Sequence, residues 1–241
     1  MVSLIAQQIF EESAQQQHVL GTLGRDKYGD KYRYVKNGGV ALATGHLLQE
    51  PAEDANYRSM AVAVAAAIGS DEVTVTLGGT AVTANQFDEG ILYVESSTGL
   101  GQQFHIKRHE VQTSTTGSCK FTLDRPLAIA LTTSSQVTVR KSPYKGVIEY
   151  PVTTQTGGAV GVALQATTIS YFAWVKSGGN CPVLFDTGTN TSNGVTGVAP
   201  SAAVAGSVAP VLDAVGSIVI GFAREVVSVD STFGLVHLTI D

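Results

Sequence analysis

Short segments in which apolar and polar residues alternate recur along the chain from Ser59 onward, and turn residues separate them at intervals of roughly ten residues. Successive side chains of a strand point to opposite faces of a sheet, so this pattern predicts strands with one buried face. Regular spacing of many short strands is typical of a β-sandwich or a barrel. The clearest expected strands lie at 72–76, 91–95, 103–107, 120–123 and 136–140.

Two hairpins are expected outside this region. Residues 25–36 carry five basic residues interleaved with three tyrosines, and Gly29-Asp30 divides them into two short runs. Residues 171–176 alternate in polarity, and Ser-Gly-Gly-Asn at 177–180 then leads into a second apolar run at 182–185. A glycine-containing turn between two such runs predicts a β-hairpin.

The first 18 residues differ from the rest of the chain. Val2, Ile5 and Ile9 have loose helical spacing, whereas the glutamine-rich stretch after them has no packing preference. We expect an arm that becomes ordered on docking, either as a short helix or as an extended segment that reaches roughly 60 Å at ~3.3 Å per residue. A frayed terminus explains the same composition.

The chain is accordingly divided into the arm at 1–18, a β-rich domain at 19–157 with the basic hairpin, and a low-charge β region at 158–241. Gly157-Gly158 marks a boundary between the last two, or a β-turn within one domain. Val, Thr and Ala dominate where a helical protein would carry Leu, Glu and Lys. The predicted fold class is all-β, with one or more β-sandwich or jelly-roll-like domains.

Charge is nearly absent from one long segment. Between Tyr150 and Ala223 the only charged residues are Lys176, Asp186 and Asp213, whereas the chain-wide charged fraction of 15% would place about eleven there. Soluble domains normally cover themselves with charged side chains, because exposed charge keeps them dispersed and buried charge is costly. We therefore expect this segment to lie against other copies of the chain or against another protein, which makes assembly the leading function.

The net charge and the length of the apolar runs exclude some classes of partner. A formal net charge of −5 gives no electrostatic footprint for nucleic acid or an anionic membrane. The longest apolar run, 60–68, is too short to span a bilayer, and residues 1–18 lack the Lys or Arg of a secretory signal. We expect a soluble chain made in the cytosol. Cys119 and Cys181 lack CxxC spacing, and two isolated buried thiols are favoured over a disulfide.

One motif suggests catalysis. Asp186-Thr187-Gly188 follows an apolar run, as in the loop with which aspartic proteases present a catalytic carboxylate. Only one copy is present, so two chains would have to pair before two carboxylates could share a proton. The same residues form an ordinary exit from a strand. No GxGxxG, Walker, GxSxG or HExxH motif occurs, and we expect no enzyme, no catalytic residue and no cofactor.

Two further groups of residues have candidate chemistry. His105 and His109 share a face of the expected strand but would lie about 13 Å apart, so solvated surface histidines are favoured over metal ligands. The basic hairpin could bind phosphates while its tyrosines stack on bases, although Asp26 and Asp30 dilute its charge. A charged edge hairpin, or a patch that docks onto an acidic lattice, explains it equally. We expect no metal and no nucleic acid.

Two segments resemble a known class of protein. Tyr-Gly-Asp-Lys-Tyr-Arg-Tyr-Val-Lys-Asn-Gly-Gly at 28–39, followed by Ala-Leu-Ala-Thr-Gly-His-Leu-Leu-Gln at 41–49, resembles tailed-phage virion proteins. In these, a Gly-x-x-Tyr/Phe-Arg-Tyr strand precedes an Ala-Leu-x-x-Gly-x-Leu strand near the N-terminus. Residues 161–163 through 173–175, with the glycines after them, resemble a second recurring element. The resemblance covers roughly a quarter of the chain.

The resemblance implies a capsid cement or decoration protein, that is, an auxiliary head protein. Such proteins are β-rich and commonly trimeric, and they sit on the outer head surface between major capsid subunits. They act through surfaces, so no functional residue is carried over from them.

We therefore expect a non-enzymatic virion structural protein on the capsid exterior, which stabilises the lattice. Its expected partners are the major capsid protein lattice and other copies of itself in a homotrimer. The alternative is another exterior module: a fibre base, a tail component or a glycan-binding head. In the glycan reading, loop 187–195 supplies hydrogen bonds and Trp174 or Tyr171 supplies a stacking platform. The residues expected to bind partners are Val2, Ile5, Ile9 and Phe10 as docking contacts of the arm, and Arg25, Lys27, Lys31 and Arg33 as an electrostatic guide.

Overall fold

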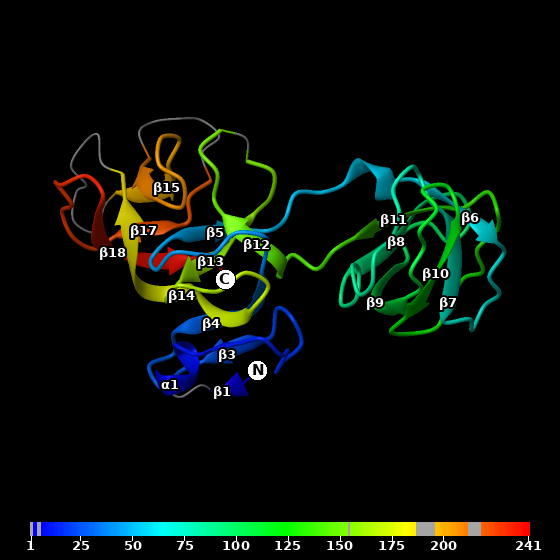
Figure 1. Ribbon diagram of the computed structural model, residues 1–241, viewed down its shortest axis with the longest axis horizontal. Coiled ribbons are helices and arrows are strands. Elements are labelled where there is room, and N and C mark those ends of the chain that lie inside the picture. Colours follow the sequence, from blue (N-terminus) through cyan, green and yellow to red (C-terminus); the bar gives the residue numbers. More distant parts are fainter. Residues whose placement is uncertain (1, 4–5, 154, 187–195, 212–217) are drawn as a thin grey trace. The chain divides into compact units, whose positions relative to one another are not determined.

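The computed structural model describes residues 2–3, 6–153, 155–186, 196–211 and 218–241 (Figure 1). The chain forms two compact units: unit 1 consists of Met1–Ala52 and Pro143–Asp241, and unit 2 consists of Glu53–Ser142. Unit 2 is therefore an insertion within the sequence of unit 1. The all-β prediction is confirmed, since the described helical segments are the short α1 (Ala6–Ile9) and η1 (Ala55–Tyr57). Within the described residues no helix has the length and apolar character needed to cross a bilayer.

The boundaries of the units differ from the position considered at Gly157-Gly158. Both glycines belong to unit 1. The Gly158 N–H donates to Glu50 Oε1 at 2.9 Å, and the Glu50 N–H donates to the Gly158 carbonyl oxygen at 3.0 Å. These bonds join the two sequence halves of unit 1 across the insertion, so the glycines lie in a loop of one unit.

Unit 2 is a closed barrel with the strand order β10-β7-β6-β11-β8-β9. Closure leaves the sheet without an exposed edge. All five strands expected from the alternation in this region form, with ends that differ by at most two residues. The strands are β6 (Met60–Val64), β7 (Glu72–Thr76), β8 (Ile91–Ser96), β9 (Gln103–His109), β10 (Ser118–Leu123) and β11 (Gln136–Arg140).

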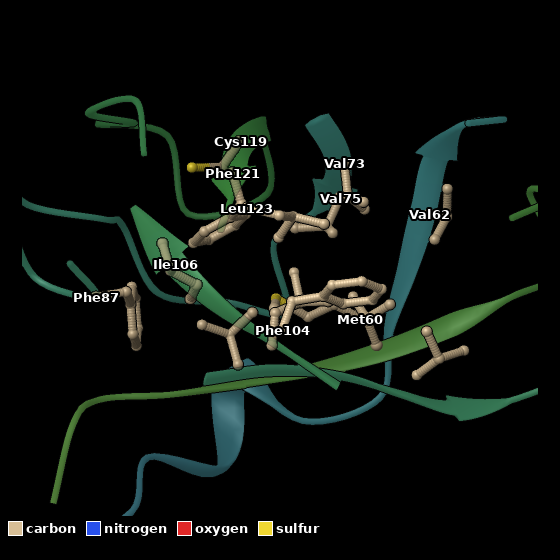
Figure 2. Packing of buried hydrophobic residues seen from close by; sticks show 14 of the residues in the cluster. Met60, Val62, Val73, Val75, Phe87, Phe104, Ile106, Cys119, Phe121 and Leu123 are labelled. Carbon is tan, nitrogen blue, oxygen red and sulfur yellow. The ribbon is translucent and has the colours of Figure 1, made fainter. Parts of the chain in front are cut away.

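The interior of the barrel is filled by the inward residues of the alternating strands (Figure 2). Phe87 lies at the centre of an aromatic group, with its ring centroid 4.7 Å from that of Tyr57 and 6.0 Å from that of Phe121. Every residue of this core lies between Tyr57 and Val139. Unit 2 therefore builds its hydrophobic core from its own sequence alone.

His109 differs from the solvated histidine that the sequence predicted, because its side chain is fully buried. Thr122 of β10 pairs with Arg108, but the next residue, Leu123, pairs with Ile106, so Lys107 is an extra residue in β9. This β-bulge reverses the inward and outward alternation beyond it. His109 consequently faces the barrel interior, where it accepts a hydrogen bond from the Phe87 N–H at Nε2 (3.0 Å), while Nδ1 lies 2.9 Å from the Glu110 carbonyl oxygen.

Unit 1 contains the remaining strands in one sheet. The basic hairpin expected from the sequence is confirmed: β3 and β4 pair antiparallel, with Arg25 opposite Lys31, and Gly29 in the turn has φ +88°. The strands are β1 (Val2–Ser3), β2 (Glu12–Ser13), β3 (Leu23–Arg25), β4 (Lys31–Asn37), β5 (Leu47–Gln49), β12 (Lys145–Glu149), β13 (Ala159–Ala163), β14 (Phe172–Phe185), β15 (Gly197–Pro200), β16 (Val208–Pro210), β17 (Gly221–Ala223) and β18 (Thr232–Thr239).

The pairings of unit 1 close into two rings that share β14. One ring runs β4-β12-β5-β13-β14 and returns to β4. The other runs β14-β16-β15-β17-β18 and returns to β14. The first half of β14 belongs to the first ring and its second half to the second, so this strand connects the two parts of the unit.

The continuity of β14 corrects the hairpin predicted at 171–185. The strand runs through the Ser-Gly-Gly-Asn segment without a turn, and its register against β4 shifts between Lys176 and Gly178. Gly179 has φ +92°, and a Cβ there would overlap Asp30 Oδ1. The glycines thus permit a local irregularity and a close side-chain approach inside one long strand, which a sequence pattern cannot distinguish from a turn.

Each part of unit 1 has its own group of buried residues. The second ring encloses the larger group, which includes Val183, Phe185, Val236 and Leu238. The first ring encloses a smaller group around Val35, Leu48 and Val175. The arm packs beside the pair β4–β14, where six buried residues meet. They are Ile9, Leu20, Tyr32, Tyr34, Phe172 and Trp174.

Candidate functional site: an apolar sheet face and its pocket

One face of the second ring presents apolar side chains to solvent. On β18, Phe233 is 54% exposed and Leu235 is 37% exposed. Their cross-strand partners on β14 are Leu184 and Pro182. Phe222 of β17, also exposed, lies opposite the next outward position of β18. We call these five residues the apolar face.

The apolar face results from strands that are apolar on both sides. Gly234, Val236 and Leu238 of β18 point into the buried core, and the alternating positions Phe233 and Leu235 point away from it. A surface strand of a soluble protein normally carries polar residues at the outward positions. Apolar residues on both sides of one strand are typical of a sheet that another surface covers.

A pocket of about 490 Å³ continues the apolar face. Pro182 and Phe233 belong to both, and Gly45 forms part of the wall. Gly45 has φ +75°, and a Cβ there would overlap the Phe233 ring, so glycine is needed for the ring to lie against the main chain. The other lining residues are Ile9, Phe10, Asp26, Tyr32, Thr44, Ala163, Leu164 and Lys176.

The low-charge segment contributes little exposed charge to this region. Of its three charged residues, Lys176 is only 7% exposed and is paired with Asp30. Asp186 is partly buried, and its carboxylate accepts a hydrogen bond from the Ser201 hydroxyl. Asp213 lies outside the described residues. Among the described residues, the segment is therefore even less charged at its surface than its sequence indicates.

Two basic residues of the hairpin, Arg33 and Lys31, bind Asp241, whereas Arg25 and Lys27 are exposed. Arg33 binds Asp241 through both carboxylate oxygens at 2.7 Å, and Lys31 donates to the main-chain oxygen of Asp241 at 2.8 Å. The Arg33 guanidinium lowers the pKa of the Asp241 carboxyl, and the same hydrogen bonds raise the pKa of Arg33. Of the four residues expected to act as an electrostatic guide, Arg25 and Lys27 are therefore the two that are exposed.

The arm residues expected to dock onto a partner are also separated by the structure. Ile9 is 5% exposed and packs in the core of its own chain, so it is not available to another protein in this conformation. Val2 is partly buried in the parallel pair β1–β3, and Ile5 lies outside the described residues. Phe10 is exposed at the rim of the apolar pocket. Phe10 is the described arm residue that best fits a docking contact.

The structure describes the residues of the alternative functions only in part. Trp174 of β14 is buried in the group that packs against the arm, which corrects the expectation that it could serve as a stacking platform. Tyr171 is partly buried. The glycan-binding loop 187–195 and the Thr-Gly of the protease-like motif lie outside the described residues. Within the described part of the chain no group of three or more His, Cys, Asp or Glu could hold a metal ion.

The two cysteines are free and buried, as the sequence predicted. Burial raises the pKa of the Cys119 thiol to about 11, with a further contribution from Glu110. Burial raises the pKa of the Cys181 thiol to about 12, with Asp30 adding to the effect and Lys176 opposing it. Both thiols are therefore protonated and unreactive at neutral pH.

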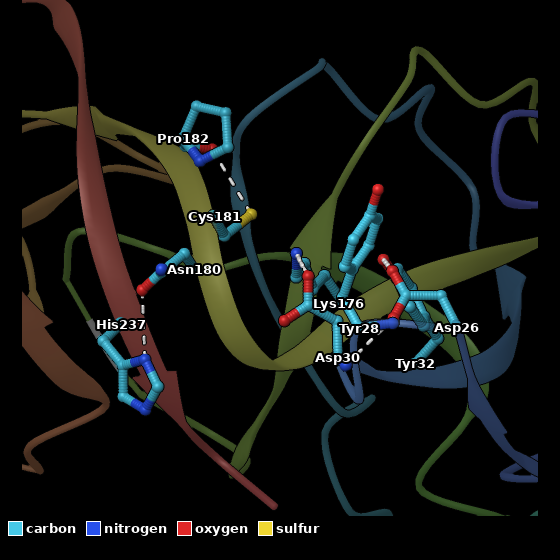
Figure 3. Close-up of polar contacts among 9 residues, drawn as sticks. All are labelled: Asp26, Tyr28, Asp30, Tyr32, Lys176, Asn180, Cys181, Pro182 and His237. Carbon is cyan, nitrogen blue, oxygen red and sulfur yellow. Dashed lines mark hydrogen bonds and ion pairs between the residues drawn. The ribbon is translucent and has the colours of Figure 1, made fainter. Parts of the chain in front are cut away.

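Sequence reasoning missed the polar group beside the pocket. Lys176 reaches Asp30, which ends the turn of the basic hairpin, and Asp26 accepts hydrogen bonds from the main-chain N–H groups of Tyr28 (2.9 Å) and Asp30 (3.1 Å) (Figure 3). A signal was present: Lys176 directly follows four apolar residues in a segment that is almost free of charge. A lone lysine in such a strand predicts a buried acidic partner, although the sequence does not identify which one.

In comparisons with known proteins, no family model, curated protein or solved structure matches the chain.

Proposed function

We propose that this chain is a non-enzymatic virion structural protein, a cement or decoration subunit that binds the outer surface of a phage head and stabilises the capsid lattice. The apolar face carries the proposal. Its residues lie on paired strands, it continues into a pocket, and Pro182, Leu184 and Phe222 belong to the low-charge segment. Interfaces between permanently associated subunits are more apolar than ordinary protein surfaces.

Self-association is the first expected use of the apolar face. A homotrimer would cover Phe222, Phe233 and Leu235 with the corresponding surface of the neighbouring subunits. Repetition around a closed symmetry axis would also prevent open-ended association through an apolar strand face. Attachment to the lattice would then use the arm and two exposed basic residues of the hairpin, Arg25 and Lys27.

The mass of the purified chain in solution tests this assembly. Light scattering across a dilution series is expected to give a stable species near three times 25.1 kDa. The double substitution Phe233→Ser, Leu235→Ser is expected to shift the species toward the monomer. A matched control is Val64→Ser, Ile68→Ser, which changes two exposed apolar residues of unit 2. A wild-type monomer at all concentrations would contradict the trimer, and a dimer would redirect attention to paired copies of Asp186.

Attachment is tested on heads stripped of auxiliary proteins. Phe10→Ser is expected to lower the occupancy of the chain on such heads at least tenfold, which is the effect of losing about 1.4 kcal/mol of contact. Because Phe10 is exposed in the chain itself, its loss leaves the fold intact. Ile9→Ser would instead damage the core of unit 1. Unchanged occupancy of the Phe10 variant would remove the arm from the attachment mechanism.

A further inference from the structure

Lys176 and Asp30 are held in contact by two paired strands, β14 and β4. Lys176 lies in β14 opposite Tyr32 of β4, and Asp30 directly precedes β4. The Lys176 Nζ contacts Asp30 Oδ2. The lysine side chain is almost completely buried, and the Asp30 side chain is mostly buried. Figure 3 shows the two side chains meeting between the strands.

The surroundings fix both side chains in place. Gly179 has a positive φ and no Cβ, which leaves space for the Asp30 carboxylate directly above the main chain of β14. Asp26 holds the turn that carries Asp30, and its second oxygen accepts a hydrogen bond from the Tyr32 hydroxyl at 3.2 Å. The Tyr32 ring centroid lies 5.6 Å from the Lys176 Nζ. The amine and the carboxyl group therefore have little freedom to separate.

A buried ion pair is costly to maintain, because both charges lose their water. A condensation reaction would remove both charges and leave a neutral amide. The reaction needs a close amine and carboxyl group, a restricted geometry and little competing water. The contact brings the amine and the carboxyl group together, and the strand pairing restricts their geometry. The burial of Lys176 limits the access of water to the amine.

We propose that Lys176 and Asp30 form an intramolecular isopeptide bond. Transfer of one proton from the ammonium to the carboxylate gives a neutral amine and a neutral acid. The Nζ lone pair then attacks Cγ of Asp30, the Nζ–Cγ bond forms, and one Cγ–O bond breaks. The leaving oxygen departs as water with the acid proton and one amine proton. No oxidant, reductant or co-reactant is needed.

Asp26 is a positioning residue in this reaction. It binds the Asp30 main chain and the Tyr32 hydroxyl, and it lines the same pocket as Lys176. Burial, together with the Asp26 and Asp30 carboxylates, raises the pKa of Tyr32 well above its ordinary value, so its hydroxyl stays protonated and continues to donate. The buried Cys181 thiol is protonated at neutral pH and does not compete with the amine for Asp30.

The mass of the intact chain tests the bond. After denaturation, the full-length protein is expected to be about 18 Da lighter than its sequence, which is the mass of one water. Proteolysis is expected to release a branched peptide in which the segment containing Asp30 is joined to the segment containing Lys176. Fragmentation of that peptide locates the bond. A wild-type chain with the full sequence mass after prolonged incubation would overturn the proposal.

Two substitutions separate the bond from other losses of water. Lys176→Arg keeps the positive charge but has no nucleophilic amine at neutral pH, so the variant is expected to have its full sequence mass. Lys31→Arg, on the neighbouring strand, is the matched control and is expected to keep the loss of about 18 Da. A loss that persists in Lys176→Arg would assign the dehydration to another site. If Lys176→Arg fails to fold, the branched peptide of the wild type decides the question.

Asp26 is tested by how completely the bond forms. Asp26→Asn keeps the size of the side chain but removes its charge, and a mixture of linked and unlinked chains is expected. Asp26→Glu restores the carboxylate and is expected to recover most of the linked form. Equal linkage in the wild type and the Asn variant would remove Asp26 from the reaction. The proposal does not depend on the virion role, since the mass is measured on the chain alone.

Discussion

Single residues in unit 1 are placed by very close approaches of the main chain. Gly179 and Gly45 both have positive φ, and each leaves space for one side chain, Asp30 and Phe233 respectively. The same two contacts define the polar group and the rim of the pocket. Small changes at these glycines are therefore expected to affect both stability and the candidate sites.

Gly179→Ala tests this dependence. The methyl group would overlap Asp30, and the backbone conformation is strained for alanine, so we expect a loss of about 1–3 kcal/mol in the free energy of unfolding of unit 1. Urea denaturation followed by circular dichroism measures it. Gly39→Ala is the matched control, because a Cβ there meets no atom within 4 Å, and its effect is expected to be small. Equal stability of the two variants would show that Asp30 can move away freely.

The buried thiol of Cys181 is expected to make the free energy of unfolding depend on pH in the alkaline range. Its pKa rises from 9.0 to about 12 on folding. Below pH 9 the thiol is protonated in both states, and its contribution to stability is complete. As the pH rises from about 9 toward 12 only the unfolded state ionises, so the free energy of unfolding should fall across this window.

Urea denaturation at a series of alkaline pH values measures this loss. In Cys181→Ala the part of the slope that comes from the thiol is expected to disappear. Identical slopes in the variant and the wild type would contradict the buried, protonated thiol.

At the scale of elements, the sequence predicted strands well where alternation was interrupted only by turns. All five strands expected in unit 2 form, because side-chain period and burial agree along each one. Prediction failed where one residue broke the period. The extra residue Lys107 turned His109 inward, and the glycines of 177–180 continued β14 where a turn was expected. The bulge depends on the register of β9 against its neighbour β10, which the alternation does not reveal. The course of β14 depends on β4 and β18, which are distant in sequence, and the apolar face and the Lys176–Asp30 contact depend on these pairings as well.

A substitution at the centre of the unit 2 barrel is expected to lower the stability of the unit. Phe121 is fully buried and packs against the rings of Phe87 and His109, so Phe121→Ala should lower the stability of unit 2 by about 3–5 kcal/mol. The neighbouring Thr122→Ala changes a side chain outside the core and is expected to cost less than about 0.5 kcal/mol. Thermal unfolding of both variants provides the comparison. A small effect at Phe121 would mean that the barrel interior can collapse around the cavity.

At the scale of the whole molecule, the two units are separate in sequence and in their cores. All buried core residues of unit 2 fall between Tyr57 and Val139, whereas the core groups of unit 1 combine residues from both sides of the insertion. The domain division drawn from composition did not anticipate this arrangement. Strand pairing between residues about a hundred positions apart leaves no local trace in the composition.

Residues 53–142 are expected to fold when expressed alone. Their barrel is closed and their core is complete, so the fragment should give a dispersed amide NMR spectrum and a single cooperative thermal transition. Residues 1–52 alone should remain unfolded, because β4 and β5 lack their partners β12, β13 and β14. A disordered spectrum for 53–142 would show that unit 2 depends on unit 1.

The insertion also sets an order of events on the ribosome. Residues 1–52 emerge first but cannot complete their sheet, since the strands they need follow Pro143. Unit 2 emerges next and has everything required to fold. Its folding replaces a long flexible loop by a compact connection, which lowers the entropic cost of bringing the two halves of unit 1 together. The barrel is therefore expected to act during synthesis as a compact spacer that prepares unit 1 for closure.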